Sequence, residues 1–317
     1  MDNEYILITG AGGFIGSHLI DYLINRNEKV LGTYHNATTD LKINSGKCEL
    51  IACDVKSKEQ VENIIKEYKP KIIFHLAAQS YPTVSWEKPN YTIEANMCGT
   101  INIFESVRKF NLNSHVLVAC SSAEYGFVTK DEVPVKETHA LLPLHPYGVS
   151  KVGQDLLAYQ YFKNYGIDTT RIRIFNTTGP RKVNDVCSDF SKRIALAEKG
   201  SINKIKVGNL DTKRAFMDVR DLINALFLAT QKCESGEVYN ICGTKAYKIR
   251  EILDELLDLT DIKPEIFQDS ALMRPTDEPV IMGDITKFVK ATGWKQTITL
   301  EKTLQDMLDF WREELNK

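Results

Sequence analysis

The stretch ILITGAGGFIG, residues 6–16, limits most strongly what this chain can fold into. An apolar run long enough for one buried strand leads into Gly10, Gly13 and Gly16, and a helical pattern begins at Phe14. Gly10 allows a sharp turn after the strand, Gly13 leaves room for a pyrophosphate beside the backbone, and Gly16 lets the helix lie close to the strand. The stretch therefore predicts a strand, a turn and a helix that bind a dinucleotide.

The end of the second predicted strand does not decide between NAD and NADP. After Val30 and Leu31 the chain reads GTYHN, residues 32–36. This segment has neither an Asp or Glu to hold a ribose 2′-hydroxyl nor an Arg to pair with a 2′-phosphate. Both cofactors therefore stay open.

The charge balance excludes several classes of partner. The 317 residues include 40 Lys and Arg against 42 Asp and Glu, a formal net charge of −2, so we expect no nucleic-acid or membrane partner. No apolar run approaches the ~20 residues that span a bilayer, and the chain begins with a strand rather than a leader, so we expect a cytoplasmic protein. The seven cysteines are scattered without a C-x-x-C pair, which is typical of core thiols in a reducing compartment, and we expect no metal site.

Short apolar runs alternate with longer amphipathic segments along most of the chain. Strands are predicted at 5–9, 30–33, 50–52, 72–76, 116–120, 170–175 and 238–241. Helices are predicted at 14–25, 58–68, 89–110 and 146–165. This alternation predicts an α/β fold, a doubly wound parallel sheet of the Rossmann type, with ligands at the carboxyl ends of its strands.

The rhythm changes after residue 175. Residues 176–216 are rich in Arg, Lys, Asn and Gly, residues 262–293 contain three prolines, and a closing helix is predicted at 300–315. We expect a smaller, discontinuous α/β lobe over the open face of the sheet. The expected division is 1–175 with 218–261 for the dinucleotide-binding domain, and 176–217 with 262–317 for the second lobe.

Tyr147 and Lys151, in the segment PYGVSK, are candidates for acid–base chemistry. They lie four residues apart near the start of a predicted helix, so their side chains share one face. A phenol with a reference pKa near ~10 is a weak acid or base at neutral pH, and a neighbouring cation favours the phenolate. A tyrosine and a lysine at this spacing are common in proteins. The functional interpretation of this pair therefore depends on the segment that precedes it in the chain.

That earlier segment is ACSSAEYG, residues 119–126, at the end of the fifth predicted strand. Ser121, Ser122 and Glu124 therefore fall at the edge of the sheet where a substrate would lie. A hydroxyl there can donate a hydrogen bond to a sugar oxygen, and a carboxylate can act as a second base or position the sugar.

Taken together, these motifs resemble the extended short-chain dehydrogenase/reductase family, also called the NAD-dependent epimerase/dehydratase family, over nearly the whole chain. The resemblance rests on GAGGFIG, ACDV, HLAAQS at 75–80, Asn96 with Gly99 and Thr100, SSAEYG, PYGVSK and RIFNTTGPR at 171–181. Within that family the chain is similar to GDP-6-deoxy-4-keto-mannose reductases and GDP-mannose 4,6-dehydratases. The segments that carry this similarity are AAQS followed by SWEKP, SDF at 188–190, VGNLDTKRAFMDVRD at 207–221, MRPTDEPVIMGD at 273–284 and GWK at 293–295.

The resemblance implies roles for individual residues. Tyr147 would exchange a proton with the sugar oxygen, Lys151 would hold Tyr147 and the nicotinamide ribose, and Ser122 would bond the same sugar oxygen. The cofactor, NAD or NADP, would be held by Tyr147, Lys151, Gly10, Gly13, Phe14, Ile15, Gly16, Asp54, Val55, Leu76, Ala77, Ala78 and Gln79, with Asp54 on the adenine. The nucleotide-sugar substrate would be held by Ser80, Asn176, Arg181, Arg214 and Arg274. The three arginines suit this role because the planar guanidinium group can grip a phosphate with two hydrogen bonds.

The segment SSAEYG is one residue shorter than the usual family form, and this leaves two alignments open. If the gap follows Glu124, then Ser122 and Glu124 match the hydroxyl and the acid of the family. Without a gap, Ser121 is the hydroxyl and Ala123 occupies the place of the acid, so a dehydratase would lack its base at C5.

The leading hypothesis is an NAD(P)H-dependent reductase of a GDP-4-keto-6-deoxy-hexose at C4. The alternatives are a GDP-mannose 4,6-dehydratase and a C4 epimerase or dehydrogenase of a nucleotide sugar. A dinucleotide sensor without activity is disfavoured, because such proteins typically lose the Tyr and Lys pair. We also expect a homodimer, because two helices carry apolar residues on more than one side, and helices of this kind pair across a two-fold axis in the family. These residues are Ile101, Ile103, Phe104, Leu156 and Leu157.

Overall fold

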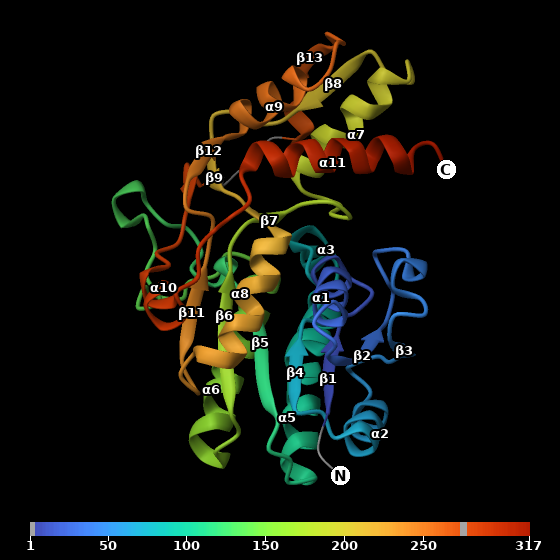
Figure 1. Ribbon diagram of the computed structural model, residues 1–317. Helices are drawn as coiled ribbons and strands as arrows, with labels where there is room; N and C mark the ends of the chain where they lie inside the picture. The colour runs from blue at the N-terminus through green and yellow to red at the C-terminus, as the bar shows by residue number, and fades with distance from the viewer. Residues whose placement is uncertain (1–3, 273–277) are drawn as a thin grey trace.

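The computed structural model describes residues 4–272 and 278–317 and places a parallel sheet beneath a smaller lobe (Figure 1). The sheet has seven strands in the order β11-β6-β5-β4-β1-β2-β3, and every pair is parallel. In that order their bounds are Val238–Ile241, Thr169–Ile174, His115–Ser121, Ile72–His75, Tyr5–Thr9, Lys29–Tyr34 and Glu49–Ala52. The chain reverses its winding direction between β1 and β4, which is where doubly wound sheets bind ligands. The predicted fold class is confirmed.

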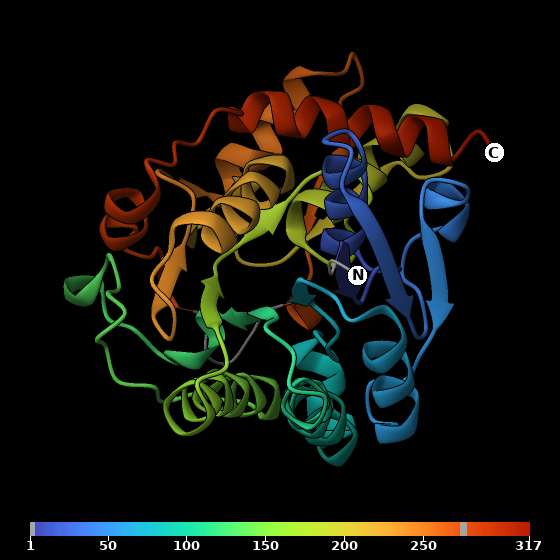
Figure 2. The same ribbon diagram turned by 60° about the horizontal axis from the view of Figure 1, so that its bottom comes forward.

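Helices cover both faces of the sheet (Figure 2). One face carries α1 (Phe14–Ile24) and α8 (Val219–Lys232), and the other carries α2 (Lys58–Tyr68), α5 (Gly99–Lys109) and α6 (Pro146–Tyr165). Side chains alternate along β1, so that Ile6 and Ile8 pack with α1 and α8 while Leu7 packs with the other layer. Both layers are therefore closed by apolar cores, which explains the nearly continuous apolar runs of the strands.

The segment predicted as one helix at 89–110 is interrupted. It consists of α4 (Pro89–Ile93), a π-helical turn (Glu94–Cys98) and α5, and α3 (Pro82–Glu87) precedes it. The π-helical turn buries Asn96, whose side chain bonds the backbone N–H and C=O of Gln79 at 2.7 and 3.0 Å and the hydroxyl of Ser150 at 2.8 Å. Irregular turns of this type frequently occur at functional sites, and this one fixes the segment after β4 against α6.

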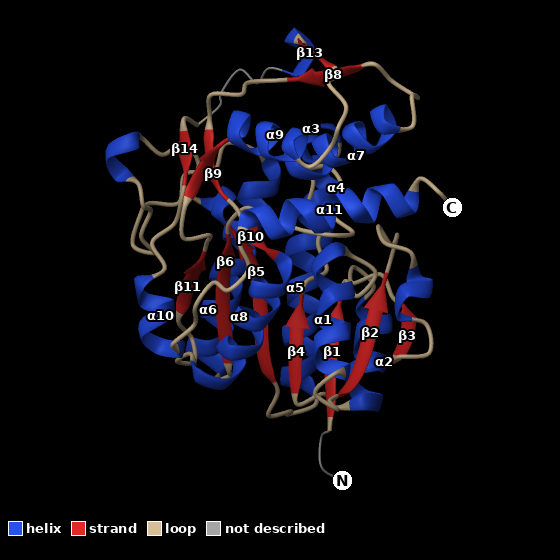
Figure 3. Ribbon diagram, turned by 45° about the horizontal axis from the view of Figure 1, so that its top comes forward, coloured by secondary structure: helices blue, strands red, loops and turns tan. Residues whose placement is uncertain are grey.

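The upper lobe is built around three helices that pack on one another (Figure 3). They are α7 (Val186–Glu198), α9 (Ile249–Asp258) and α11 (Leu300–Glu314). Two small sheets flank them, β13 (Glu265–Gln268) with β8 (Lys204–Val207), and β12 (Ala246–Lys248) with β9 (Lys213–Ala215) and β14 (Val280–Ile281). The pair β10 (Met217–Asp218) and β7 (Thr177–Thr178) lies at the junction with the main sheet.

Two parts of the expected division need correction. Helix α9 was expected in the dinucleotide-binding domain, but Ile252, Leu253 and Leu256 pack with α7 and α11 in the upper lobe. Helix α10 (Thr286–Thr292) was expected in the second lobe, but Phe288 packs with α8 and β11. Both segments have apolar helical faces, and only the packing decides which core receives each face. Within the described residues, no helix combines the length and apolar character needed to cross a bilayer.

Candidate active site

A cleft of about 560 Å³ opens at the carboxyl ends of the strands, from the glycine-rich turn after β1 to the start of α6. It is lined by all the residues expected at the cofactor site. These are Gly10, Gly13, Phe14, Ile15, Gly16, Asp54, Val55, Leu76, Ala77, Ala78, Gln79, Tyr147 and Lys151, with Ser80 beside them. One continuous cavity therefore joins the turn to the tyrosine and lysine.

The glycine-rich turn fits a dinucleotide phosphate. Gly10 has φ +75°, and a Cβ there would lie 2.8 Å from the backbone nitrogen of Ala77. A Cβ on Gly16 would lie 2.3 Å from the carbonyl oxygen of Gly10, so the close approach of α1 to the turn requires glycine. No side chain caps α1, and its first turn carries no acidic residue, so backbone N–H groups and the positive end of the helix face the cleft.

The end of the cleft beside β2, where the adenosine of the cofactor is expected, is polar. Among the described residues, it has no charged side chain that would distinguish NAD from NADP. It is lined by residues 34–38 and by Asp54. The Asp54 carboxylate accepts a hydrogen bond from the backbone N–H of Lys56 at 3.0 Å and lies 3.9 Å from His35 Nε2. Neither a carboxylate nor a guanidinium occupies the end of β2, as the sequence predicts, and this end fits either NAD or NADP.

At the other end of the cleft, the start of α6 brings Tyr147 and Lys151 together. Pro146 and the His145 side chain, which accepts from the N–H of Gly148 at 3.0 Å, start the helix there. The Lys151 ammonium is buried, donates to the carbonyl oxygen of Ala119 at 2.7 Å and lies 5.8 Å from the centre of the Tyr147 ring. The two side chains therefore share one face, as their spacing predicts.

Burial shifts both pKa values away from their usual range. It raises the pKa of Tyr147 to about 12, although a hydrogen bond with Ser121 opposes the shift. It lowers the pKa of Lys151 to about 8. The phenol is therefore protonated at neutral pH, while the ammonium beside it is still mostly charged.

The hydroxyl that meets Tyr147 belongs to Ser121 and not to Ser122. Ser121 is the last residue of β5 and its side chain bonds the phenol, whereas Ser122 begins the following 3₁₀ turn, Ser122–Glu124. Both serines line the cleft. Ser121 is the hydroxyl that the alignment without a gap predicts.

Glu124 does not face the cleft, which corrects the expectation that it acts on the sugar. Its side chain is fully buried beneath the 3₁₀ turn. One carboxylate oxygen accepts from the backbone N–H of Ser121 at 2.8 Å, and the other accepts from Arg173 Nε at 3.1 Å. Glu124, Asp155 and Cys120 offer ligand atoms within 4.8 Å of one another, but the Arg173 guanidinium already supplies the positive charge there.

The expected substrate residues have three different outcomes. Asn176 lines the cleft, and its side-chain nitrogen is buried and has no hydrogen-bond partner among the described residues. Arg214 lies in β9, outside the lining of the cleft, and donates to the carbonyl oxygens of Lys213 and Glu278 at 2.9 and 2.7 Å. Arg274 lies outside the described residues.

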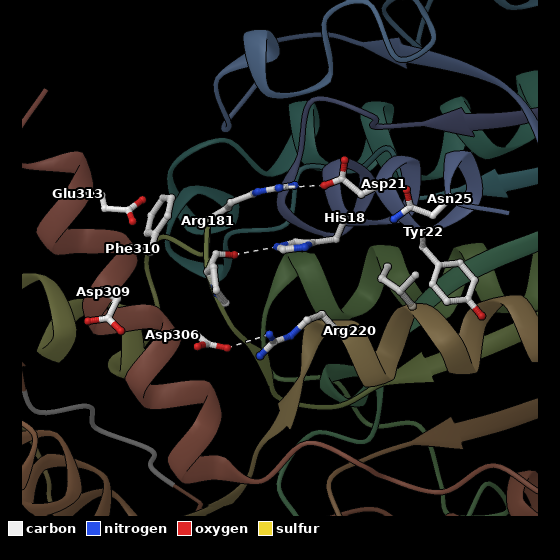
Figure 4. Close-up of a pocket in the computed structure, with 12 residues that line it drawn as sticks. His18, Asp21, Tyr22, Asn25, Arg181, Arg220, Asp306, Asp309, Phe310 and Glu313 are labelled. Atoms are coloured by element: carbon white, nitrogen blue, oxygen red, sulfur yellow. Dashed lines mark hydrogen bonds and ion pairs between the residues drawn. The ribbon is translucent and has the colours of Figure 1, made fainter. Parts of the chain in front are cut away.

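Arg181 points away from the cleft, which corrects its expected contact with the substrate. It pairs with Asp21 at 2.8 Å in a second hollow of about 590 Å³ between α1, α8 and α11 (Figure 4). The lining of this hollow includes none of the glycines of the turn, nor Tyr147 or Lys151. We therefore assign the chemistry to the cleft.

Sequence reasoning missed the segment that closes the cleft from above. Residues 182–185, just before α7, line it, and the Lys182 ammonium lies 4.7 Å from the centre of the Phe14 ring at the start of α1. The only available signal was their position directly after the GPR motif. A loop that lies over a site by virtue of lobe packing leaves no periodic pattern in the sequence.

Comparisons with known proteins agree with this geometry. The family model for GDP-mannose 4,6 dehydratase matches residues 7–307. The GDP-6-deoxy-D-mannose reductase of Pseudomonas aeruginosa is 29% identical over 99% of both chains. Among solved structures, RMD from Pseudomonas aeruginosa, complexed with NADPH, has a TM-score of 0.85 at 28% identity and covers 98% of this chain and 99% of its own. The UDP-glucose 4-epimerase of Thermotoga maritima, with UDP-glucose, has a TM-score of 0.89 at 25% identity, with 98% and 99% covered.

These relatives include NAD(P)-dependent reductases, dehydratases and epimerases of nucleotide sugars. The two solved structures match the fold of this chain over 98% of its length. The match of the family model spans almost the entire sequence. The chain therefore belongs to the GDP-mannose 4,6-dehydratase family and is an NAD(P)-dependent enzyme of nucleotide-sugar metabolism.

Proposed function

We propose that this protein is an NAD(P)H-dependent reductase that converts the C4 ketone of a GDP-4-keto-6-deoxy-hexose to an alcohol. The observation that carries the proposal is the arrangement at the end of β5. Ser121 meets Tyr147 there, and the side chain of Glu124 turns into the core. We take the alignment without a gap, in which Ala123 has the place of the acid that a dehydratase of this family needs. The similarity to a GDP-6-deoxy-D-mannose reductase over the full length supports the same reaction.

The residues present suit a reduction. When bound, the nicotinamide supplies a hydride to the carbonyl carbon. Tyr147 holds the proton that the carbonyl oxygen needs, because its pKa of about 12 keeps the phenol protonated. Ser121 bonds the same oxygen, and the Lys151 ammonium stabilises the phenolate that forms when the proton leaves.

The far part of the cleft would hold the nucleotide half of the substrate. Asn176 offers an amide N–H that has no partner among the described residues, and the segment at 182–185 lines the same cleft. The assignment of guanine rests on the relatives, since the base is part of the name of the reductase and of the dehydratases. The protein would act in the cytoplasm, where such activated sugars are made.

The first test is a pair of incubations with the purified protein. With NADPH or NADH and GDP-4-keto-6-deoxy-mannose, we expect oxidation of the nicotinamide and formation of a GDP-6-deoxy-hexose. With GDP-mannose and catalytic NAD or NADP, we expect no 4-keto-6-deoxy product, because the site lacks the acid for elimination across C5 and C6. Release of that product would overturn the proposal in favour of the dehydratase.

The epimerase reading is the second candidate, and the structural likeness to the Thermotoga maritima enzyme favours it. An epimerase would interconvert two UDP-sugars or GDP-sugars with no net change in nicotinamide absorbance. A panel of GDP-, UDP- and dTDP-sugars, with both products and cofactor absorbance followed, separates the three reactions.

We further propose a homodimer formed by α6. Leu156 is 53% exposed on the outer face of this helix, and Val149 and Tyr159 lie exposed on the same helix. By contrast, Ile103 and Phe104, which the sequence also suggested for this contact, are buried against the protein's own sheet. Sedimentation or light scattering should give twice the mass of the chain, and Leu156→Glu should reduce it to a monomer. A monomeric mass for the unmodified protein would contradict the proposal.

A further inference from the structure

Glu124 makes contacts that connect the buried centre of the protein with the hydroxyl at Tyr147. Its two carboxylate oxygens accept from two different elements, the backbone N–H of Ser121 at the end of β5 and the guanidinium of Arg173 in β6. The Ser121 hydroxyl in turn accepts from the N–H of Ala123 at 3.2 Å and bonds the phenol of Tyr147. A single hydrogen bond therefore links Glu124 to Ser121, whose hydroxyl bonds the phenol of Tyr147.

The other side of the 3₁₀ turn leaves Ser121 little room to move. A Cβ on Gly148 would lie 2.7 Å from the carbonyl oxygen of Ala123, so the turn packs directly on the start of α6, beside Tyr147. Gly126 ends the segment with φ +72°, and a Cβ there would lie 1.8 Å from the carbonyl oxygen of Leu142. The turn is thus fixed at its far end by backbone packing and at Ser121 by Glu124.

Arg173 and Asp155 hold Glu124 from below. Arg173 Nε donates to Asp155 at 2.9 Å as well as to Glu124, and Arg173 also donates to the Tyr125 hydroxyl and the carbonyl oxygen of Glu137, both at 3.0 Å. Arg171 pairs with Asp155 at 2.5 Å on the other side. All four ionisable side chains are buried, so the network is anchored in the core and not in solvent.

We propose that Glu124 is a positioning residue, which sets the Ser121 hydroxyl against Tyr147 by holding the backbone of Ser121 from the buried Arg173 network. The inference rests on the proposed function, because it explains how the Ser121 hydroxyl of that same site is held in position. It replaces the role of acid or base that the sequence suggested for Glu124.

Positioning of this kind depends on the reach of the side chain more than on its charge. Burial and the neighbouring Asp155 raise the pKa of Glu124 to about 8, so near neutral pH this pair of carboxyl groups retains a proton. An oxygen at the position of Oε1 accepts from the Ser121 N–H in either state. Glutamine keeps this oxygen at the same distance from the backbone, whereas aspartate is shorter by one methylene group and retracts it.

The test compares E124D with E124Q. We expect E124D to lower kcat by about 10- to 100-fold, because a displacement of about 1 Å at a reacting group costs about 100-fold. KM and the dissociation constant for NADPH should stay within about 3-fold of the values for the unmodified enzyme. Glu124 does not line the cleft, and the residues that line it are unchanged. E124Q should keep kcat within about tenfold, because its amide oxygen still accepts from the Ser121 N–H, although its NH2 group cannot accept the bond from Arg173.

A matched control exists in the same protein. Glu132 closes an equivalent turn by accepting from the backbone N–H of Thr129 at 2.9 Å, but this turn is exposed and lies outside the cleft lining. E132D makes the same chemical change and should leave kcat unchanged. Adding Ser121→Ala to E124D should lower kcat little further, because both changes act through one hydroxyl.

A second readout does not depend on turnover. Crystal structures of E124D and E124Q without cofactor should show the Ser121 hydroxyl displaced from Tyr147 in E124D and in place in E124Q. An unmoved hydroxyl in E124D overturns the inference, and so does additivity of the E124D and Ser121→Ala losses. If E124D does not fold, the test of the positioning role depends on E124Q. A folded E124Q that loses more than about tenfold in kcat overturns the inference. If the enzyme acts on another sugar, the kinetic comparison is made on that substrate, and the crystal structures apply unchanged.

Discussion

Tyr147→Phe should lower kcat by about 1,000-fold while the enzyme still binds its cofactor, because proton transfer by a positioned side chain contributes about 10²- to 10⁴-fold. The change removes one oxygen and keeps the ring, so the packing at the start of α6 is preserved. The Ser121 hydroxyl and the Lys151 ammonium stay in place, but neither holds a proton in the position that the carbonyl oxygen requires. Stopped-flow or steady-state assays of nicotinamide oxidation measure the loss.

Tyr165→Phe provides the control for this experiment. Tyr165 lies at the last turn of the same helix with half of its surface exposed, so loss of its hydroxyl should leave kcat unchanged. Fluorescence titration with NADPH should give similar dissociation constants for both variants and the unmodified enzyme. Turnover that survives unchanged in Tyr147→Phe would show that the site is assigned to the wrong residue.

Arg173→Met should lower the free energy of unfolding by about 3–5 kcal/mol, because it leaves the buried Glu124 carboxyl without its guanidinium partner and Asp155 with Arg171 alone. The guanidinium donates to both Glu124 and Asp155 in the core of the main domain. Methionine fills a similar volume but supplies no hydrogen bond or charge. Chemical denaturation near neutral pH measures the loss, and Arg108→Met, which breaks an exposed ion pair with Glu105, should cost less than about 1 kcal/mol.

The deficit of Arg173→Met should also depend on pH. The pKa of Glu124 is already raised to about 8 in the folded protein, and removal of the guanidinium raises it further. A carboxyl group with a raised pKa in the folded state binds more protons there than in the unfolded chain, so its contribution to stability is lost as pH rises through that range. In both proteins the folded Glu124 carboxyl keeps its proton up to about pH 8, so the difference in stability should stay constant from pH 5 to pH 7. It should widen above about pH 8, where Glu124 of the unmodified protein ionises and that of the variant does not. A difference that stays constant above about pH 8 as well would contradict the assignment of the network.

The main sheet and its helices follow from the sequence because their signals are local. Strands β1 and β11 and helices α2 and α6 have the predicted bounds, since apolar periodicity, Ser57 as a cap of α2 and Gly166 at the end of α6 mark them within a few residues. The glycine-rich turn is equally local, because the backbone there admits only glycine. By contrast, α9 and α10 were assigned to the wrong cores, since an amphipathic face does not name its partner.

By itself, the sequence determined the fold class, the cofactor turn and the pair Tyr147 and Lys151, all of which depend on residues close together in the chain. Only the tertiary structure decided that Ser121 rather than Ser122 meets the phenol, that Glu124 belongs to a buried arginine network, and that Arg181 pairs with Asp21 away from the cleft. The physical reason is that each of these side chains is placed by a partner distant in the chain. A shift of one residue in the turn after β5 changes which side chain faces the cleft. The Glu124 carboxylate then pairs with Arg173, whose position is decided by the packing of β6.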